Sequence, residues 1–323
     1  MTPDPSVTSG PTSRPASSGR LLLLDTASLY FRAFFGIPKS MTSPDGRPVN
    51  AVRGMLDFVA TLVSRYAPTH LVAAWDDDWR PDWRVALLPS YKAHRVAVES
   101  TSGPDVEETP DELDPQVPVI KEALTTLGIA VIGAPGCEAD DVIGTLTARA
   151  AMPVDVVTGD RDLFQLVDDD RAVRVLYTAR GVGKLEVVDE AAVARKYGIP
   201  GRAYADFAVL RGDPSDGMPG VAGVGDKTAA SLVTRHGDLD GVIAAARAGT
   251  GMSATLVNKI RSAHDYLEAA RIVVRVKADA ELPDIDATLP TAPADAAAWE
   301  VLVERWGLGS SAERVVAALA ARG

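Results

Sequence analysis

Short apolar runs, each leading into an acidic residue, recur along the first half of the chain. They lie at residues 21–24 before Asp25, at 71–75 before Asp76, and at 154–159 before Asp160. Short, bounded runs rich in leucine or β-branched residues predict buried strands of a parallel sheet. Because ligands of such sheets bind beyond the carboxyl ends of the strands, we expect these acids to gather in one crevice.

Segments with helical spacing alternate with these runs. Apolar residues three and four apart predict helices at residues 49–66 and 117–127, and a further short strand is expected at Ala130–Ile132. From about Val188 onward the pattern is mostly helical, with stripes of alanine, leucine and valine. This alternation predicts an α/β fold in which a mostly parallel sheet is flanked by helices.

Three clustered acids open the helix that is expected after residue 137. Glu138, Asp140 and Asp141 fall within four positions, after a strand and a glycine turn. Acids in a first helical turn also suit the helix dipole, so they could be N-terminal helix acids and nothing more. We favour metal binding, because three acids in four positions exceed what capping requires. By contrast, the acids at 168–170 are interpreted as a solvated turn with no role.

Further acids follow in short segments that contain glycine or proline. Asp160 and Asp162 stand two apart at a strand-to-helix turn, and Asp213 and Asp216 lie in a loop rich in glycine and proline. So many carboxylates cannot stay ionised together without cations, which predicts hard divalent metals, Mg²⁺ or Mn²⁺. The complete candidate set comprises Asp25, Asp76, Glu138, Asp140, Asp141, Asp160, Asp162, Asp213 and Asp216.

The formal net charge of −11 over 323 residues argues, taken alone, against a nucleic-acid partner. The bases are not spread evenly, however. Between Trp79 and Arg95 there are four bases and one acid, interleaved with aromatic residues. Local patches of this kind, and not the total charge, decide nucleic-acid binding.

Residues 96–116 change character, with seven acids and no lysine or arginine. We interpret them as an exposed, mobile segment inserted in the domain; a simple acidic surface loop explains the composition equally well. Residues 1–20 are rich in Pro, Ser, Thr and Gly and lack an apolar core, which predicts a disordered tail and not a secretory signal. Cys137 is the only cysteine, so an intramolecular disulfide is excluded. No apolar stretch is long enough for a membrane span, and we expect a cytoplasmic protein that joins the nucleoid when it acts.

A glycine-rich loop occupies residues 220–228 and precedes an amphipathic helix. Gly220, Gly223 and Gly225 permit a tight turn whose backbone N–H groups suit a phosphate, and Lys227, which Thr228 follows, can supply a countercharge. Its spacing departs from that of a Walker A loop, and no strand precedes it.

Taken in order, these segments resemble the structure-specific 5′-nuclease family. That family includes flap endonucleases, phage 5′-exonucleases and the 5′-nuclease domain of bacterial DNA polymerase I. The likeness runs from about Leu21 to at least Pro283. Its motifs are Leu24-Asp25 with Arg32, Trp75-Asp76, Tyr91-Lys92-Ala93-His94-Arg95, Glu138-Ala139-Asp140-Asp141, Gly159-Asp160-Arg161-Asp162, Gly212-Asp213-Pro214-Ser215-Asp216 and the loop at 219–228. Any one could arise by chance, but the full set in this order is specific.

The resemblance implies a PIN-like α/β sheet with a helical arch and a helix–hairpin–helix module. We therefore expect a nuclease domain at 21–187 with the arch at about 79–116. A helical DNA-binding region would occupy 188–323, with the helix–hairpin–helix at about 212–237.

The resemblance also implies roles for single residues. Asp25, Asp76, Glu138, Asp140 and Asp141 would hold one metal ion, and Asp160, Asp162, Asp213 and Asp216 would hold or orient a second. Contacts to the scissile phosphate would come from Arg32, Lys92 and Arg95, with Tyr91 as a base-stacking surface. The loop at 220–228 would grip the duplex backbone with the help of a monovalent cation. Without the resemblance, Arg32 could equally pair with a core acid, and Lys92 could be a solvated helix residue.

Three positions depart from the family pattern. Thr26 follows Asp25 where glycine is usual, and Gly217 stands where asparagine usually follows the second aspartate of its loop. The run of acids at 76–78 leaves the ligand between Asp76 and Asp77 open; Asp76 is preferred because it directly ends the strand.

The expected function is metal-dependent hydrolysis of DNA phosphodiesters at free 5′ ends, nicks and 5′ flaps, leaving 5′-phosphates, in replication and repair. A monomer with no membrane partner is expected. An RNA-cleaving PIN-type nuclease is an alternative that the glycine-rich hairpin disfavours, since the hairpin suits duplex DNA. A Mg²⁺ phosphatase is weaker still, because its Asp-x-Asp-x-Thr pattern is absent. A DNA-junction binding protein with a degenerate metal site is the non-enzymatic alternative.

Overall fold

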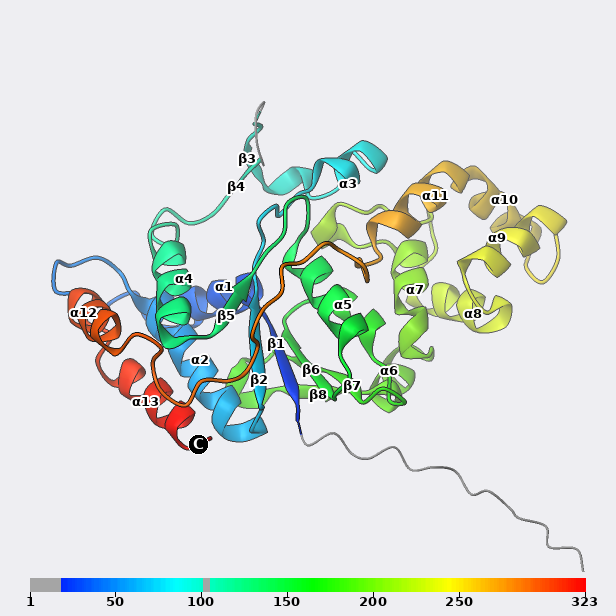
Figure 1. Cartoon of the computed structure of the whole chain (residues 1–323). Coiled ribbons are helices and arrows are strands. Elements are labelled where there is room, and N and C mark those ends of the chain that lie inside the picture. Colours follow the sequence, from blue (N-terminus) through cyan, green and yellow to red (C-terminus); the bar gives the residue numbers. More distant parts are fainter. Residues whose placement is uncertain (1–18, 101–104) are drawn as a thin grey trace, which may run out of the picture.

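The computed structural model describes residues 19–100 and 105–323. The tail expected at 1–20 lies almost wholly outside these ranges, as do residues 101–104 of the acidic segment. A central sheet carries helices on both faces, and a second group of helices adjoins it on one side (Figure 1). None of the described helices is both long and apolar enough to cross a bilayer.

Six strands form the central sheet in the spatial order β5-β2-β1-β6-β7-β8. Every neighbouring pair is parallel except β7 and β8, which run antiparallel at one edge. The strands are β1 (Leu21–Asp25), β2 (His70–Ala74), β5 (Ala130–Ile132), β6 (Val154–Thr158), β7 (Val173–Tyr177) and β8 (Glu186–Val188). The predicted mostly parallel α/β sheet is confirmed.

The strand order reverses around β1. Strands β2 and β5 lie on one side of it, and β6 and β7 lie on the other. Asp25 is the last residue of β1 and pairs with Ala74 at the end of β2, while Thr158 ends the neighbouring β6. Open parallel sheets bind ligands where the strand order reverses, beyond the carboxyl ends. The boundary between β1 and β6 is therefore where chemistry is expected.

Side-chain alternation along β1 builds a core on each face of the sheet. Leu22 and Leu24 pack in one layer, and Leu21 and Leu23 in the other. The first layer contains α1 (Thr26–Gly36), α2 (Asn50–Tyr66), α4 (Gln116–Leu127), α12 (Ala296–Trp306) and α13 (Gly309–Ala320). The second layer contains α5 (Ala139–Arg149), whose Val142 and Ile143 are fully buried.

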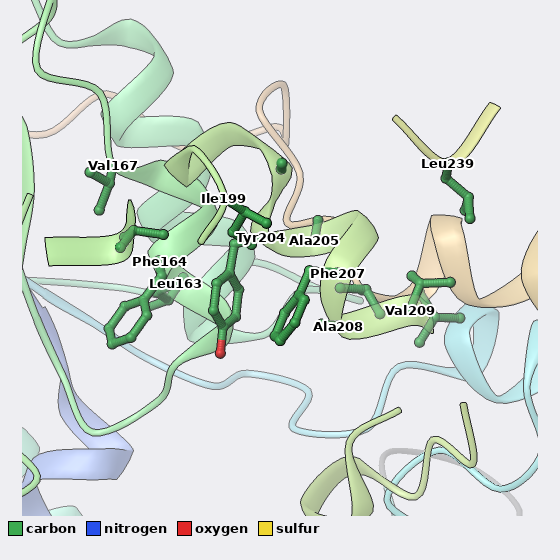
Figure 2. Close-up of a cluster of buried hydrophobic side chains, with 14 of the residues drawn as sticks. Leu163, Phe164, Val167, Ile199, Tyr204, Ala205, Phe207, Ala208, Val209 and Leu239 are labelled. Atoms are coloured by element: carbon green, nitrogen blue, oxygen red, sulfur yellow. The ribbon is translucent and has the colours of Figure 1, made fainter. Parts of the chain in front are cut away.

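The helical region continues the core of the second layer. Its helices are α6 (Glu190–Tyr197), α7 (Tyr204–Arg211), α8 (Asp226–His236), α9 (Leu239–Ala248), α10 (Ala254–Ser262) and α11 (His264–Val273). Phe164, in the 3₁₀ turn η2 (Asp162–Leu166), meets Tyr204 edge to face with ring centroids 5.3 Å apart, and Phe207 packs beside Tyr204 (Figure 2). The segment after β6 is thereby packed directly against the start of α7.

Residues 274–295 form no helix or strand and return from α11 to the sheet (orange in Figure 1). The Leu71 N–H donates to the Ala287 carbonyl (2.8 Å), and the Leu289 N–H donates to the Thr69 carbonyl (2.9 Å). The chain then ends in α12 and α13, which pack on α4 and α2. The region expected at 188–323 is thus divided in space, because its last helices belong to the layer that covers the first face of the sheet.

The segment expected to form a helical arch is only partly helical. It contains α3 (Asp82–Leu87), the 3₁₀ turn η1 (Ala93–Arg95) and an antiparallel ribbon of β3 (Val96–Val98) and β4 (Val106–Glu107). One acid of the acidic stretch, Asp105, is held by two side chains. The Trp79 indole donates to the Asp105 carbonyl (2.6 Å), and the Arg80 guanidinium donates to the Asp105 carboxylate (2.5 Å).

Candidate active site

A pocket of about 360 Å³ opens beyond the carboxyl ends of the central strands. Lys92 and Arg95 line it, together with the aromatic residues Phe31, Trp79 and Tyr177. Its acidic residues are Asp25, Asp76, Glu107, Glu138, Asp140, Asp160 and Asp213. We call this the carboxylate pocket. The structure therefore brings together six of the nine acids singled out in the sequence.

Asp25 joins the two strands at the reversal point. Its Oδ1 accepts a hydrogen bond from the Ser28 N–H (3.2 Å), and its Oδ2 accepts one from the Thr158 hydroxyl (2.6 Å). Burial raises the pKa of Asp25 to about 7; the charges of Asp76 and Asp160 add to this effect, and the Thr158 hydrogen bond opposes it. Thr158 also accepts from the Asp160 N–H (2.8 Å). Sequence reasoning missed Thr158, whose only signal is a polar residue at the end of a buried strand.

Asp76 and Asp77 lie in different surroundings. Asp76 lines the pocket, and its Oδ1 accepts from the N–H of Ala139 (2.8 Å), the first residue of α5. Asp77 is exposed, and its carboxylate lies so close to Gly133 that a Cβ there would fall 2.4 Å from the Asp77 Cγ. Burial raises the pKa of Asp76, and the nearby Lys92 opposes that shift.

Glu138 is held by three side chains. Its Oε1 accepts from the Tyr91 hydroxyl (2.8 Å) and from the Arg84 guanidinium (3.2 Å), and its Oε2 accepts from the Lys92 ammonium. Tyr91, expected as a base-stacking surface, is only 4% exposed, because its hydroxyl reaches inward to Glu138. The rings that line the pocket are those of Phe31, Trp79 and Tyr177.

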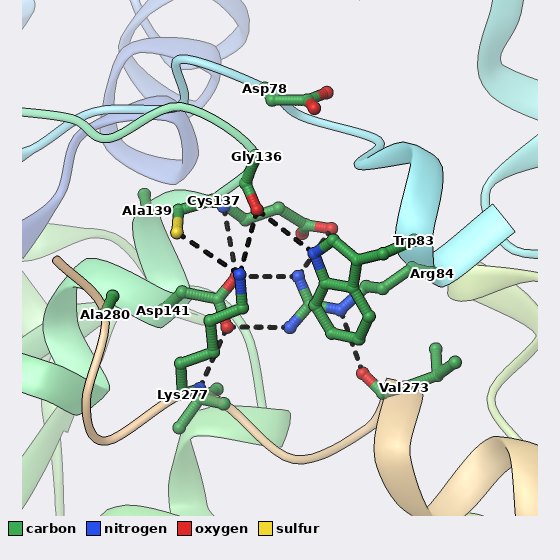
Figure 3. Close-up of polar contacts among 12 residues, drawn as sticks. Asp78, Trp83, Arg84, Gly136, Cys137, Ala139, Asp141, Val273, Lys277 and Ala280 are labelled. Atoms are coloured by element: carbon green, nitrogen blue, oxygen red, sulfur yellow. Dashed lines mark hydrogen bonds and ion pairs between the residues drawn. The ribbon is translucent and has the colours of Figure 1, made fainter. Parts of the chain in front are cut away.

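Asp141, expected among the metal ligands, does not line the pocket. Its carboxylate is fully buried and accepts from both terminal nitrogens of Arg84, each at 2.8 Å, and from the Lys277 N–H at 2.9 Å (Figure 3). Successive helical residues point about 100° apart, so neighbouring Asp140 and Asp141 face different surroundings. Only Asp140 faces the pocket.

The second group of acids surrounds the turn after β6. The Asp162 N–H donates to Asp160 Oδ1 (2.8 Å), and the Asp162 carboxylate is buried behind it. Burial raises the pKa of Asp162 well above its ordinary value, and the charges of Asp160 and Asp216 raise it further. Asp216 accepts from Arg95 (3.2 Å), whereas Asp213 accepts from Arg211 (3.1 Å). Asp162 and Asp216 therefore lie outside the pocket lining.

Gly217 permits a close contact between this loop and the segment that carries Lys92. Its φ is +70°, and a Cβ there would lie 2.0 Å from the Ser90 carbonyl oxygen. The Lys92 N–H donates to the Asp216 carbonyl (3.0 Å) across the same junction. There is no room for a side chain at this position, which accounts for glycine in place of the asparagine usual in the family.

Arg32 lies beside the carboxylate pocket and not in it. It donates to the Ala179 carbonyl (3.4 Å), and its Nε is buried without a hydrogen-bond partner. It lines an adjacent hollow with Phe35 and Arg180, and Phe31 borders both spaces.

The glycine-rich loop lies on the helical region, before α8. Gly220 and Gly223 have φ of +70° and +72°, and Gly225 directly precedes the helix. Lys227 is exposed and Thr228 half-buried in its first turn, where unpaired N–H groups favour anions. The Gly220 N–H donates to the Tyr266 hydroxyl (3.1 Å), which fixes the loop to α11.

The donor chemistry of the carboxylate pocket fits Mg²⁺ or Mn²⁺, which prefer oxygen ligands. Burial raises the pKa of Asp140 well above its ordinary value, with Asp25 and Asp160 adding to it, and Asp162 Oδ1 is buried without a partner. A divalent cation would relieve both conditions. No three His, Cys, Asp or Glu side chains in the described part of the chain already converge as a ligand group.

Two family models match the chain consecutively. The model described as "5′-3′ exonuclease, N-terminal resolvase-like domain" matches residues 20–198, and "5′-3′ exonuclease, C-terminal SAM fold" matches residues 199–297. A 5′-3′ exonuclease of Streptomyces coelicolor is 60% identical over 301 residues, which cover 93% of this chain and 100% of that protein. A 5′-3′ exonuclease of Mycobacterium tuberculosis is 53% identical over 309 residues, covering 93% and 97%.

Solved structures resemble the chain in fold. The bacteriophage T5 flap endonuclease, in a pseudo-enzyme–product complex with DNA and metal ions, matches with a TM-score of 0.60 and 14% identity. The match covers 94% of this chain and 98% of that one. At such low identity the likeness concerns the fold alone, and it agrees with the sheet and helical region described above.

Proposed function

The chain belongs to the 5′-3′ exonuclease family, and we propose that it is a metal-dependent enzyme that cuts DNA at or near free 5′ ends, nicks and 5′ flaps. The predicted resemblance to structure-specific 5′-nucleases is thereby confirmed. One observation carries the proposal for this chain. Seven carboxylates line a single pocket at the reversal point of the sheet, and Lys92 and Arg95 line the same pocket. Such a site combines ligands for divalent cations with donors for a phosphate.

We assign six of the seven pocket carboxylates as the metal-holding groups; the seventh, Glu107, lies 3.9 Å from Arg95. Asp25, Asp76, Glu138 and Asp140 would hold one ion, and Asp160 and Asp213 would hold the second, with Asp162 and Asp216 orienting them. When bound, two such ions supply an activated water and stabilise the leaving oxygen of an in-line displacement.

Lys92 and Arg95 would neutralise charge that grows on the phosphate oxygens. Lys92 is held beside the pocket by Glu138 and by the Trp79 carbonyl (3.2 Å), and Arg95 by the Ser215 carbonyl (2.7 Å). The Lys92 and Arg95 side chains are thus held in place before substrate binds. Hydrolysis that breaks the bond between phosphorus and O3′ leaves a 5′-phosphate on the product. Phe31 and Trp79 would stack on an unpaired base at the pocket.

The loop at 220–228 would hold the backbone of the duplex. The exposed N-terminus of α8 and the side chain of Lys227 support this assignment, and a monovalent cation would complete the binding site. Residues 21–187 would then form the nuclease domain, with the segment at 79–116 bordering its pocket. The DNA-binding helices would be α6–α11, and the protein would act as a monomer.

The test offers a 5′-flap duplex, labelled at either end, with Mg²⁺, with Mn²⁺ and with EDTA. Metal-dependent release near the junction is expected, and the product lengths separate flap cutting from exonuclease stepping. Asp140→Asn and Asp160→Asn should abolish cleavage and retain DNA binding. Asp170→Asn, which removes an exposed carboxylate from the turn at 168–170, is the matched control and should cleave normally.

Each result separates the alternatives. Tight flap binding with no cleavage under any metal would establish a degenerate junction-binding protein. Preferential cutting of an RNA strand of the same sequence would establish an RNA nuclease. Full activity of Asp140→Asn would refute the assignment of the metal site.

A further inference from the structure

A buried polar network lies behind the carboxylate pocket, at the base of α3 (Figure 3). Its centre is Arg84, which is 2% exposed and does not line the pocket. The guanidinium donates to both oxygens of Asp141, to Glu138, and through Nε to the Val273 carbonyl (3.0 Å). A buried arginine paired in this two-pronged way is held in one orientation.

Asp141 completes the network from the other side. Its Oδ2 accepts from the N–H of Glu138 (3.2 Å), and its Oδ1 accepts from the N–H of Lys277 (2.9 Å). Together with Arg84, these bonds leave the Asp141 carboxylate well supplied with donors and turned away from the pocket. A metal ion in the pocket could recruit it only by breaking bonds that compensate its burial.

The network joins three elements that are distant in the sequence. Arg84 belongs to α3, and Asp141 belongs to the first turn of α5. Val273 and Lys277 belong to the end of α11 and the segment that leaves the helical region. That segment is also fixed to α5 by the Thr145 hydroxyl, which donates to the Lys277 carbonyl (3.2 Å).

Glu138 is the point where this network meets the pocket. Arg84 contacts its carboxylate and Asp141 contacts its backbone N–H, while Lys92 and Tyr91 hold the carboxylate from the pocket side. Glu138 therefore has its orientation set from two directions. Removing either half of the Arg84–Asp141 pair would let the remaining buried charge pull on the Glu138 side chain or its backbone.

We propose that Arg84 and Asp141 are positioning residues that act together to hold Glu138 in its metal-binding orientation and tie it to the end of the DNA-binding helices. The proposal rests on the proposed function and deepens it. It replaces the expectation that Asp141 is itself a ligand. Removing groups that orient a metal ligand typically weakens metal affinity or activity by 10- to 100-fold.

Two variants test the proposal. Arg84→Lys keeps the charge but loses the fork that matches a carboxylate, and Asp141→Asn keeps the shape but loses the charge. The matched control is Arg174→Lys, since Arg174 also forms a two-pronged pair, through Nε and a terminal nitrogen, with buried Asp155 (2.7 and 3.1 Å) in the sheet, outside the pocket lining. Asp140→Asn serves as the reference for loss of a direct ligand.

Three quantities are measured on each protein: Mn²⁺ affinity by calorimetric titration without DNA, kcat and KM on the flap duplex, and Tm. Arg84→Lys and Asp141→Asn should each weaken Mn²⁺ binding and lower kcat by about 10- to 100-fold, with KM for DNA within about twofold of wild type. Arg174→Lys should alter only Tm. If Asp141→Asn does not fold, Arg84→Lys carries the test alone.

Two outcomes would overturn the proposal. Loss of Mn²⁺ binding in Asp141→Asn as complete as in Asp140→Asn would make Asp141 a direct ligand. A lower Tm with unchanged kcat and Mn²⁺ affinity, as in Arg174→Lys, would make the pair structural only. Failure of the proposed function would give a different result. Wild type would then cut no DNA, while the Mn²⁺ affinities of wild type and the variants could still be compared.

Discussion

Asp25 makes the metal-free protein sensitive to pH in a direction that can be worked out in advance. Its carboxyl is 6% exposed, and burial raises its pKa from 3.8 to about 7. The folded state therefore binds this proton more readily than the unfolded state does. Ionisation of Asp25 therefore lowers the free energy of unfolding. This loss is absent below pH 4, grows as the pH rises towards 7, and stays constant above that.

The size of this loss follows from the same values. A pKa of about 7 against 3.8 corresponds to about 4 kcal/mol at pH 7.5 and above. For a chain of this size that amounts to roughly 6 °C in Tm. Asp25→Asn cannot ionise, and its side-chain oxygen can still accept from the Ser28 N–H. In EDTA this variant should melt close to wild type near pH 4.5 and about 6 °C above it at pH 7.5.

Scanning calorimetry of both proteins in EDTA at several pH values between 4.5 and 8 measures the difference. Asp155→Asn is the control. It removes a buried carboxylate that Arg20 and Arg174 contact, so it should lower Tm. Added Mn²⁺ should raise the Tm of wild type more than that of Asp25→Asn, because the ion takes the place of the proton. A difference that does not grow between pH 4.5 and 7.5 would refute the argument.

Three further changes have defined outcomes. Lys92→Ala should lower kcat about 10²- to 10³-fold with little change in KM, as removal of one preorganised donor does. A loss of kcat smaller than tenfold would exclude a role of Lys92 at the phosphate. Gly217→Ala should lower both Tm and kcat, because its Cβ would meet the Ser90 carbonyl at 2.0 Å; calorimetry and the flap assay check this, and an unchanged Tm contradicts it. Trp79→Ala should raise KM for flaps about tenfold or more through lost stacking; equal KM values would assign that role elsewhere.

The features carried by periodicity could be read from the sequence. The helix expected at 49–66 is α2 (Asn50–Tyr66), and the strand expected at Ala130–Ile132 is β5. Acids that directly end buried strands, such as Asp25, also lie where a parallel sheet requires. In these segments the local pattern and the tertiary packing demand the same structure.

The details that failed depend on which segments meet in space. The pattern around Glu138 and Asp141 does not say which acid faces the pocket, because Arg84 selects Asp141 from 57 positions away. The burial of Tyr91 depends on the same network. Likewise, the helix expected after Asp162 is a five-residue 3₁₀ turn, because Phe164 is held against the start of α7.

The packing of α13 on α2 has a consequence for the biosynthesis of the protein. Helix α2 leaves the ribosome long before α13, the helix that packs on it, has been made. Until then, the α2 residues that pack on α13 have no partner there, and a nascent chain with exposed apolar surface is prone to misassembly or chaperone capture. A stop codon directly before α13 would keep every residue assigned above to the pocket and to DNA binding, and would still leave this surface bare. Such an allele would reduce the amount of enzyme in the cell through degradation, and not the chemistry of each molecule.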